Sequence, residues 1–145
     1  MHRLATLADA ARLLELRRRS IVELAPVGMS REDAETWAAK LTIAGMQQKL
    51  SQLEIWVAEV DGSIAGWVAI RDNRLEGMYT APEYVGKSVG TGLLELVESR
   101  MREKGIAAIF AQASANAERF YLQRGYEQVG IRTQEYGLPI RKQLE

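Results

Sequence analysis

Residues 78–94, MYTAPEYVGKSVGTGLL, are the most informative stretch of the sequence, because they carry a strand, a loop and the start of a helix in succession. The loop leads directly into the helix, and the free N–H groups and positive dipole end at a helix N-terminus attract anions. Gly86 and Gly90 allow the backbone to approach a ligand closely, and Lys87 adds a positive charge. The stretch therefore predicts a phosphate-binding loop, with an ordinary strand-to-helix connection as the alternative.

One phosphate-binding motif with which this loop can be compared is the P-loop. Residues 81–88 fit its pattern in relaxed form, with Ala81 in place of the first glycine. The context disfavours a P-loop, because an antiparallel meander precedes the loop and no later strand ends in a convincing Mg²⁺-binding aspartate. Pro82 also lacks the N–H group that a phosphate cradle requires. A nucleotide-binding P-loop is therefore the weaker of two phosphate interpretations.

The second interpretation includes the residues that follow the loop. Residues 78–94 resemble the coenzyme A signature of the GNAT N-acetyltransferase superfamily. In that signature a strand ending in Tyr-Val-x-Pro-x-Tyr leads to a Gln/Arg-x-x-Gly-x-Gly/Ala loop and to a helix that begins with small residues and Leu-Leu. Gly90 matches the second glycine of the loop, whereas Val85 replaces the glutamine or arginine and Ser88 replaces the first glycine. Both replacements keep the backbone N–H groups that bind pyrophosphate.

A second block of sequence supports the same resemblance. Residues 113–126, ASANAERFYLQRGY, are similar to a later GNAT motif of the form Asn-x-x-Ala-x-x-Phe-Tyr-x-x-x-Gly-Phe, and they follow the first block at the expected distance. The resemblance is firm from about residue 53 to residue 131 and weaker at both ends. Within the superfamily, the chain most resembles small, poorly characterised bacterial members.

Hydrophobic periodicity and turn signals predict an α/β fold in a single domain over residues 1–145. The expected order is β-α-α-β-β-β-α-β-α-β-β, a mixed and mostly antiparallel sheet with helices on its faces. The resemblance implies the GNAT fold, in which two parallel strands splay apart. Asp61 and Gly62 are typical of a tight hairpin turn, and Gly105 and Gly125 of helix ends. We expect strands at residues 3–6, 53–60, 63–70, 74–80, 106–112, 126–131 and 138–144, and helices at residues 7–24, 31–44, 89–104 and 115–124.

Local signals mark the ends of the first helices. Residues 6–9 and 30–33 read as capping boxes, and residues 25–28 break the chain between two helices. Gly45 is expected to end or bend the second helix, and residues 46–51 to add one more helical turn. The N-terminal half is therefore predicted to be mainly helical up to the strand at residue 53.

Composition narrows the classes of function. Nineteen Lys and Arg balance nineteen Asp and Glu, so the net charge of zero gives no case for broad nucleic-acid binding. The chain has no cysteine and one histidine, His2, which excludes disulfides, thiolate nucleophiles and cysteine-ligated zinc. No apolar run approaches the ~18 residues of a membrane span, and the first residues do not resemble a signal peptide. We expect a cytoplasmic protein with no metal, nucleic-acid or membrane partner.

The resemblance implies acetyl-CoA as the cosubstrate. Its pantetheine would pair with the strand edge at residues 78–80, and a main-chain N–H near Met78 would donate to the developing oxyanion. Gly77 is a candidate β-bulge, with a packing gap as the alternative. Asn116 would bind the pantetheine, cap a helix or do both. Phe120 would contact the cofactor, with a position in the hydrophobic core as the alternative. The implied cofactor-binding residues are Met78, Tyr79, Thr80, Val85, Gly86, Lys87, Ser88, Val89, Gly90, Thr91, Asn116 and Phe120.

Two residues are candidates for proton transfer. Tyr121 matches the tyrosine of the later motif and would protonate the departing thiolate, because a phenol with a pKa of ~10 carries its proton at neutral pH. A tyrosine buried in the core is the alternative. Glu76 is the candidate general base, acting on the amine through water, although strand alternation could also turn it towards solvent. Glu83 and Glu59 are weaker substitutes.

The predicted function is an acetyl-CoA-dependent N-acetyltransferase that acts on a primary amine of a small molecule or peptide by direct attack in a ternary complex. A non-catalytic acyl-CoA-binding or regulatory domain is the alternative. The acceptor would contact residues 25–29, Trp37 and the turn of residues 133–137 with Tyr136. Residues 17–19, three arginines, would be a solvated helix face or, facing the cleft, would repel a polyamine. A homodimer is left open.

Overall fold

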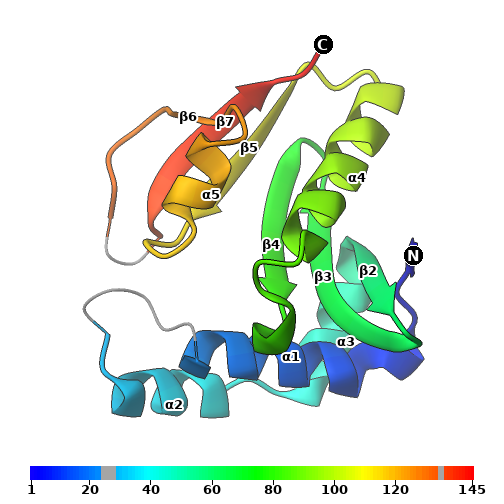
Figure 1. The fold of residues 1–145 in the computed structure, drawn as a ribbon, viewed down its shortest axis with the longest axis vertical. Helices are drawn as coiled ribbons and strands as arrows, with labels where there is room; N and C mark the ends of the chain where they lie inside the picture. Colours follow the sequence, from blue (N-terminus) through cyan, green and yellow to red (C-terminus); the bar gives the residue numbers. More distant parts are fainter. Residues whose placement is uncertain (24–28, 134–135) are drawn as a thin grey trace.

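The computed structural model describes residues 1–23, 29–133 and 136–145. Within these residues, seven strands form one mixed sheet in the order β1-β2-β3-β4-β5-β7-β6, which confirms the predicted α/β class (Figure 1). The strands are β1 (His2–Leu4), β2 (Glu54–Val60), β3 (Ser63–Arg71), β4 (Arg74–Thr80), β5 (Ala108–Ala113), β6 (Glu127–Gln128) and β7 (Leu138–Gln143). The helices are α1 (Ala10–Glu23), α2 (Arg31–Ala39), α3 (Ile43–Gln52), α4 (Val89–Glu103) and α5 (Glu118–Leu122), with 3-10 turns η1 (Leu7–Asp9) and η2 (Pro82–Tyr84).

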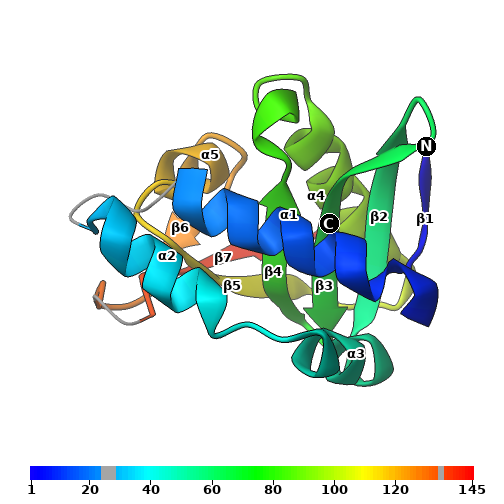
Figure 2. The ribbon, with the colours of Figure 1, turned by 90° about the horizontal axis from the view of Figure 1, so that it is seen from below.

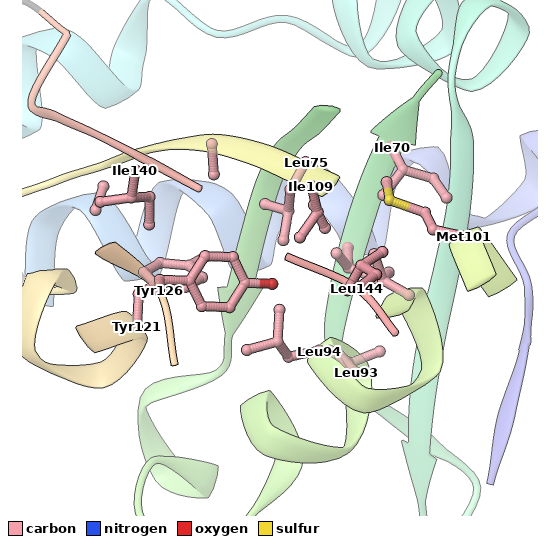
Figure 3. Close-up of a cluster of buried hydrophobic side chains, with 14 of the residues drawn as sticks. Ile70, Leu75, Leu93, Leu94, Met101, Ile109, Tyr121, Tyr126, Ile140 and Leu144 are labelled. Carbon is pink, nitrogen blue, oxygen red and sulfur yellow. The ribbon is translucent and has the colours of Figure 1, made fainter. Parts of the chain in front are cut away.

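Strand β3 is buried on both faces, and its alternating side chains enter two different cores. Val68 and Ile70 pack with α4 and with the strands β5 and β7. Trp67 and Ala69 pack on the opposite face against α1 and α3. Figure 2 shows α1, α2 and α3 together on that second face, and Figure 3 shows the core beneath α4. The sheet is therefore covered by helices on both sides, as a strand with continuous apolar character requires.

The hairpin between β2 and β3 follows the sequence prediction. Asp61 and Gly62 have φ values of 52° and 79°, and Val60 pairs with Ser63 across the turn. A two-residue turn with two positive φ angles matches the twist of the flanking strands. Gly105 and Gly125, with φ values of 78° and 93°, end α4 and α5 as predicted.

The prediction for the second and third helices was wrong. We expected one helix that Gly45 would end or bend, but α2 stops at Ala39 and α3 is a separate ten-residue helix. The Oγ1 of Thr42 accepts a hydrogen bond of 3.0 Å from the N–H of Gly45, so Thr42 is the N-cap of α3 and Gly45 lies in its first turn. The break predicted at residues 25–28 lies outside the described residues.

Two further elements are shorter than predicted. Of residues 115–124, only Glu118–Leu122 is helical, because the N–H groups of Ala117 and Glu118 both donate to the carbonyl of Ser114 and form a turn first. The strand predicted at residues 126–131 is reduced to the two residues of β6. The Thr6–Asp9 capping box is confirmed, with the carboxylate of Asp9 accepting from the N–H of Thr6 at 2.7 Å.

Strands β4 and β5 are parallel neighbours that soon separate. They pair only at Arg74 with Phe110 and at Leu75 with Ala111, after which β5 continues along β7 (Figure 1). The register between β3 and β4 shifts at the same place, because Ala69 faces Gly77 while Ile70 faces Leu75. Glu76 is therefore the extra residue of a β-bulge, which confirms the irregularity predicted at Gly77 and bends β4 where the two strands part.

Candidate functional site

A pocket of about 330 Å³ opens where β4 and β5 separate, and we call it the strand cleft. The C-terminal half of β4 forms one wall, α5 and the turn before it form another, and Ser20, Ile21 and Trp37 close it from α1 and α2. The cleft brings together predicted residues that are far apart in the sequence. These are Met78, Tyr79, Thr80, Val85, Gly90, Asn116, Phe120 and Tyr121.

A second pocket of about 260 Å³, the loop pocket, lies over the start of α4. It shares four lining residues with the strand cleft, so the two cavities adjoin. The shared residues are Thr80, Val85, Gly90 and Phe120, and the loop pocket adds Tyr84, Gly86, Ser88, Val89, Thr91 and Arg124.

The loop pocket presents backbone donors. The first helical hydrogen bond of α4 joins the N–H of Gly92 to the carbonyl of Ser88 at 3.0 Å, and no side chain caps the helix. Among the described residues, the N–H groups of Val89, Gly90 and Thr91 therefore have no partner within the protein. An anion in the loop pocket would meet these donors at the positive end of a 15-residue helix.

Ser88 has a left-handed backbone conformation, which glycine adopts more readily than other residues. Its φ of 66° and ψ of 12° are left-handed, and Gly86 two residues earlier has a φ of 82°. Left-handed backbone costs a non-glycine residue about 1–2 kcal/mol, so the surrounding structure holds Ser88 in a strained state. A glycine at position 88 would adopt the same backbone without this cost.

Two predicted loop contacts are less central than expected. Lys87 is exposed and lines neither pocket, with its Nζ 5.9 Å from the centre of the Tyr84 ring. Val85 lines both pockets but is about half exposed, at 52%. Neither residue supplies a charged group to the loop pocket.

One cation does line the loop pocket, and it was not predicted from the sequence. Arg124, just after α5, lines the loop pocket and is fixed by three hydrogen bonds. Its Nε and Nη2 donate to Thr91 Oγ1 at 3.2 and 2.9 Å, and its Nη1 donates to the carbonyl of Phe120 at 2.8 Å. The guanidinium carbon also lies 3.8 Å from the centre of the Phe120 ring. Since a guanidinium has five N–H donors, two remain for an anion.

Tyr121 is buried, with 6% of its surface exposed, yet it lines the strand cleft. Its ring packs edge-on against Phe120 and Tyr126, at 5.2 and 5.4 Å between ring centres. Within the described part of the chain, no group hydrogen-bonds its hydroxyl. Burial, and to a smaller extent the neighbouring Tyr79, raises the pKa of Tyr121 above that of a free phenol. Its hydroxyl is therefore a protonated donor throughout the neutral pH range.

The three carboxylates considered as bases lie outside the strand cleft. Glu76, at the bulge, is within 3.3 Å of Arg71 Nη2 and lines neither pocket. Glu83 binds Arg19 through both carboxylate oxygens, at 3.2 and 2.5 Å, and Glu59 binds Arg3 Nε at 2.7 Å. The strand cleft is therefore lined by Tyr121, the candidate acid, and by the edge of β4, but by no carboxylate among the described residues.

Only part of the predicted acceptor-binding region lies within the residues that the structure describes. Trp37 lines the strand cleft, whereas Tyr136 is 64% exposed on a turn; residues 25–28 and 134–135 lie outside the described part of the chain. The three arginines of residues 17–19 do not form one solvated face. Arg17 lies over the Tyr79 ring, Arg18 donates to the carbonyls of Ala38 and Leu41, and Arg19 pairs with Glu83.

Two searches of the described residues bear on other classes of protein. No cluster of three or more His, Cys, Asp or Glu side chains among them is arranged to hold a metal ion. No helix among them is long and apolar enough to cross a membrane.

Comparison with known proteins agrees with the fold. Residues 27–142 match the acetyltransferase (GNAT) domain family, so the chain belongs to this family. A GCN5-related N-acetyltransferase from Rhodopseudomonas palustris superposes with a TM-score of 0.89 at 26% identity, covering 99% of this chain and 95% of that one. None of the curated proteins matches the chain.

Two more distant structures share the fold with ligands bound. The PaiA N-acetyltransferase of Thermoplasma acidophilum, in complex with coenzyme A, has a TM-score of 0.80 at 21% identity over 99% of this chain and 98% of that one. YncA of Salmonella typhimurium, a putative acetyltransferase with its cofactor acetyl-CoA, has a TM-score of 0.66 at 20% identity over 100% and 94%.

Proposed function

We propose that residues 1–145 form one acetyl-CoA-dependent N-acetyltransferase domain that acetylates a primary amine of a small molecule or peptide. The observation that carries the proposal is that, among the described residues, the start of α4, with its unpaired N–H groups, adjoins a cleft lined by both an unpaired strand edge and buried Tyr121. Membership of the GNAT family and the coenzyme A and acetyl-CoA complexes of PaiA and YncA support this function.

The cofactor would lie across the two pockets. Its pyrophosphate would bind the free N–H groups at the start of α4 together with Arg124. Its pantetheine would run along β4, whose edge towards β5 is unpaired after Leu75 among the described residues, as an added strand would. The proposed contacts are Met78, Tyr79, Thr80, Val85, Gly86, Ser88, Val89, Gly90, Thr91, Asn116 and Phe120, with Lys87 close to the phosphates from outside.

In the proposed reaction a C–N bond forms between the acetyl group and the amine, and the C–S bond of the thioester breaks. The amine nitrogen attacks the thioester carbon, a main-chain N–H near Met78 donates to the oxyanion, and the C–S bond of the tetrahedral intermediate breaks. Tyr121 gives its proton to the coenzyme A thiolate. The attacking amine loses its proton through water to Glu76 or to solvent, since Glu76 lies outside the cleft. Holding both reactants in the cleft contributes several kcal/mol through orientation alone.

Ligand-induced stabilisation tests the cofactor. We expect coenzyme A and acetyl-CoA to raise the melting temperature and Mg-ATP to leave it unchanged, because the site suits a pyrophosphate with a pantetheine arm. A ligand that binds only the native state stabilises it by about 2.7 kcal/mol at one hundred times its Kd. Equal stabilisation by Mg-ATP would favour the P-loop interpretation instead.

Turnover separates an enzyme from a non-catalytic acyl-CoA-binding domain. Thiol release from acetyl-CoA, measured with a panel of amines, should exceed the rate without an amine for at least one acceptor. Binding of coenzyme A with no amine-dependent release for any acceptor would favour the non-catalytic alternative.

Arg124→Gln is expected to weaken coenzyme A binding about 10-fold, because a charge-assisted contact to a phosphate is lost. The affinity of the variant should also depend less on salt than that of the wild type. Calorimetry at two salt concentrations measures both effects. Lys87→Gln is the matched control: this exposed cation lies outside both pockets, and its removal should change the affinity less. Equal losses in both variants would contradict the special role of Arg124.

A further inference from the structure

A third open pocket, of about 330 Å³, lies between α1 and α3 on the face of the sheet seen in Figure 2. We call it the α1–α3 pocket; none of its lining residues lines the strand cleft or the loop pocket. Three cations, Arg17, Lys40 and Lys49, line it, and no carboxylate does. The apolar side chains of its wall are Leu14, Leu41 and Met46.

The cations of this pocket have no counter-ions within the described residues, where no carboxylate lies within 4 Å of any of the three. Other arginines of α1 are paired: Arg12 with Glu15 at 2.9 Å, and Arg19 with Glu83 at 2.5 Å. The Nε of Arg17 is moreover buried without a hydrogen-bond partner. A buried donor without a partner is costly, so the protein itself leaves the guanidinium of Arg17 incompletely hydrogen-bonded.

The charges around Lys49 also favour an anionic ligand. Burial lowers the pKa of Lys49, and the positive charges of Arg17 and Arg71 lower it further, while Glu76 acts in the opposite direction. Glu76 is already engaged by Arg71. The local excess of positive charge is therefore left for a ligand to neutralise.

One aromatic ring links the α1–α3 pocket to the strand cleft, where the reaction is proposed to occur. The guanidinium carbon of Arg17 lies 5.6 Å from the centre of the Tyr79 ring, and Tyr79 lines the strand cleft. A ligand that binds Arg17 would thus contact a residue adjacent to the wall of the cleft. This placement gives an anion in the α1–α3 pocket a physical connection to the strand cleft.

We propose that the α1–α3 pocket binds the carboxylate of a small organic molecule through Arg17 and Lys49, with a short apolar part of that molecule against Leu14, Leu41 and Met46. The flat fork of a guanidinium matches a carboxylate in two parallel hydrogen bonds. Polyamines, which carry only positive charge, would be repelled. Because the α1–α3 pocket and the strand cleft share no lining residue among those described, the carboxylate belongs to an effector that is separate from the acceptor amine.

Three probes with the same chain and different head groups test the pocket in the free protein: hexanoate, hexanol and hexylamine. We expect hexanoate to bind in calorimetry and to raise the melting temperature, and the neutral and cationic probes to do neither. Arg17→Gln and Lys49→Gln should each weaken hexanoate binding at least 10-fold. Arg31→Gln, which removes an exposed cation paired with Glu35, should leave it unchanged.

A cooperative melting transition and an unchanged circular dichroism spectrum serve as the check that each variant is folded. Absence of hexanoate binding to the wild type, equal binding of hexanol, or unchanged affinity in folded Arg17→Gln would each overturn the proposal. These outcomes need no turnover, so they are independent of the proposed acetyltransferase activity.

A second arm tests the link to the reaction, using an acceptor amine that has no carboxylate. We expect hexanoate to alter the acetylation of this amine without competing with it, and Arg17→Gln to abolish that effect. Acetylation that hexanoate leaves unchanged, or an effect of hexanoate that persists in folded Arg17→Gln, would overturn the pocket's link to the reaction.

Discussion

Tyr121→Phe is expected to lower kcat by ~10²–10⁴-fold while leaving acetyl-CoA affinity nearly intact, because it removes a proton donor used in the transition state. The ring stays in place, so its contacts with Phe120 and Tyr126 are kept. An interaction made only in the transition state lowers kcat and kcat/KM together. Steady-state kinetics with an identified acceptor measures the change, provided that chemistry limits the rate.

Tyr126→Phe is the matched control for this variant. Tyr126 is also buried, but its hydroxyl donates to Glu98 Oε2 at 2.9 Å and it does not line the strand cleft. Its replacement should cost stability, about 1 kcal/mol for the lost hydrogen bond, with little change in kcat. Full turnover by Tyr121→Phe would instead make Tyr121 a core residue and leave water as the acid.

The pH dependence of kcat follows from the same residue. Burial raises the pKa of Tyr121 above the ordinary value, so the acid form is present at and below that value and is lost only at higher pH. We expect no fall in kcat from this group between neutral pH and about pH 10, the pKa of a free phenol. A decline in this range that persists in Tyr121→Phe would come from another group.

Gly90→Val is expected to weaken coenzyme A binding at least about 10-fold, equivalent to about 1.4 kcal/mol, while the protein stays folded. A Cβ at Gly90 would lie 3.4 Å from Phe120 Cζ and 3.7 Å from Thr80 Oγ1, and all three residues line both pockets. The methyl groups of valine would therefore enter the space through which the cofactor passes, beside the free N–H groups of α4. Calorimetric titration with coenzyme A measures the loss.

Gly92→Val provides the comparison on the same helix. A Cβ at Gly92 would meet the His2 ring at 3.4 Å, a contact as close as that at Gly90, but Gly92 lines neither pocket. This variant should bind coenzyme A almost as well as the wild type. Unchanged affinity in folded Gly90→Val, or an equal loss in both variants, would place the pyrophosphate site elsewhere.

The sequence by itself determined those features whose cause is local. Asp61 and Gly62 specify the hairpin because a two-residue turn needs backbone that these residues tolerate, and Gly105 ends α4 for a similar reason. The loop before α4 could be singled out because the features that favour an anion there, free N–H groups and glycines, belong to consecutive residues. Tyr121 was found from a motif within one short segment. The N-cap at Thr42 was also a local signal, but it was overlooked, so α3 was predicted as a single turn.

Only the tertiary structure decided which distant groups share a site. The cleft exists because β4 and β5 pair at just two positions and then follow different partners, a register that depends on strands more than thirty residues apart. The same long-range packing brings Arg124 to Thr91, and it turns Arg17 towards Tyr79 while Arg19 pairs with Glu83. Strand alternation and helix periodicity assign a side chain to a face, but which charge or cavity it meets there depends on how separate elements pack against one another.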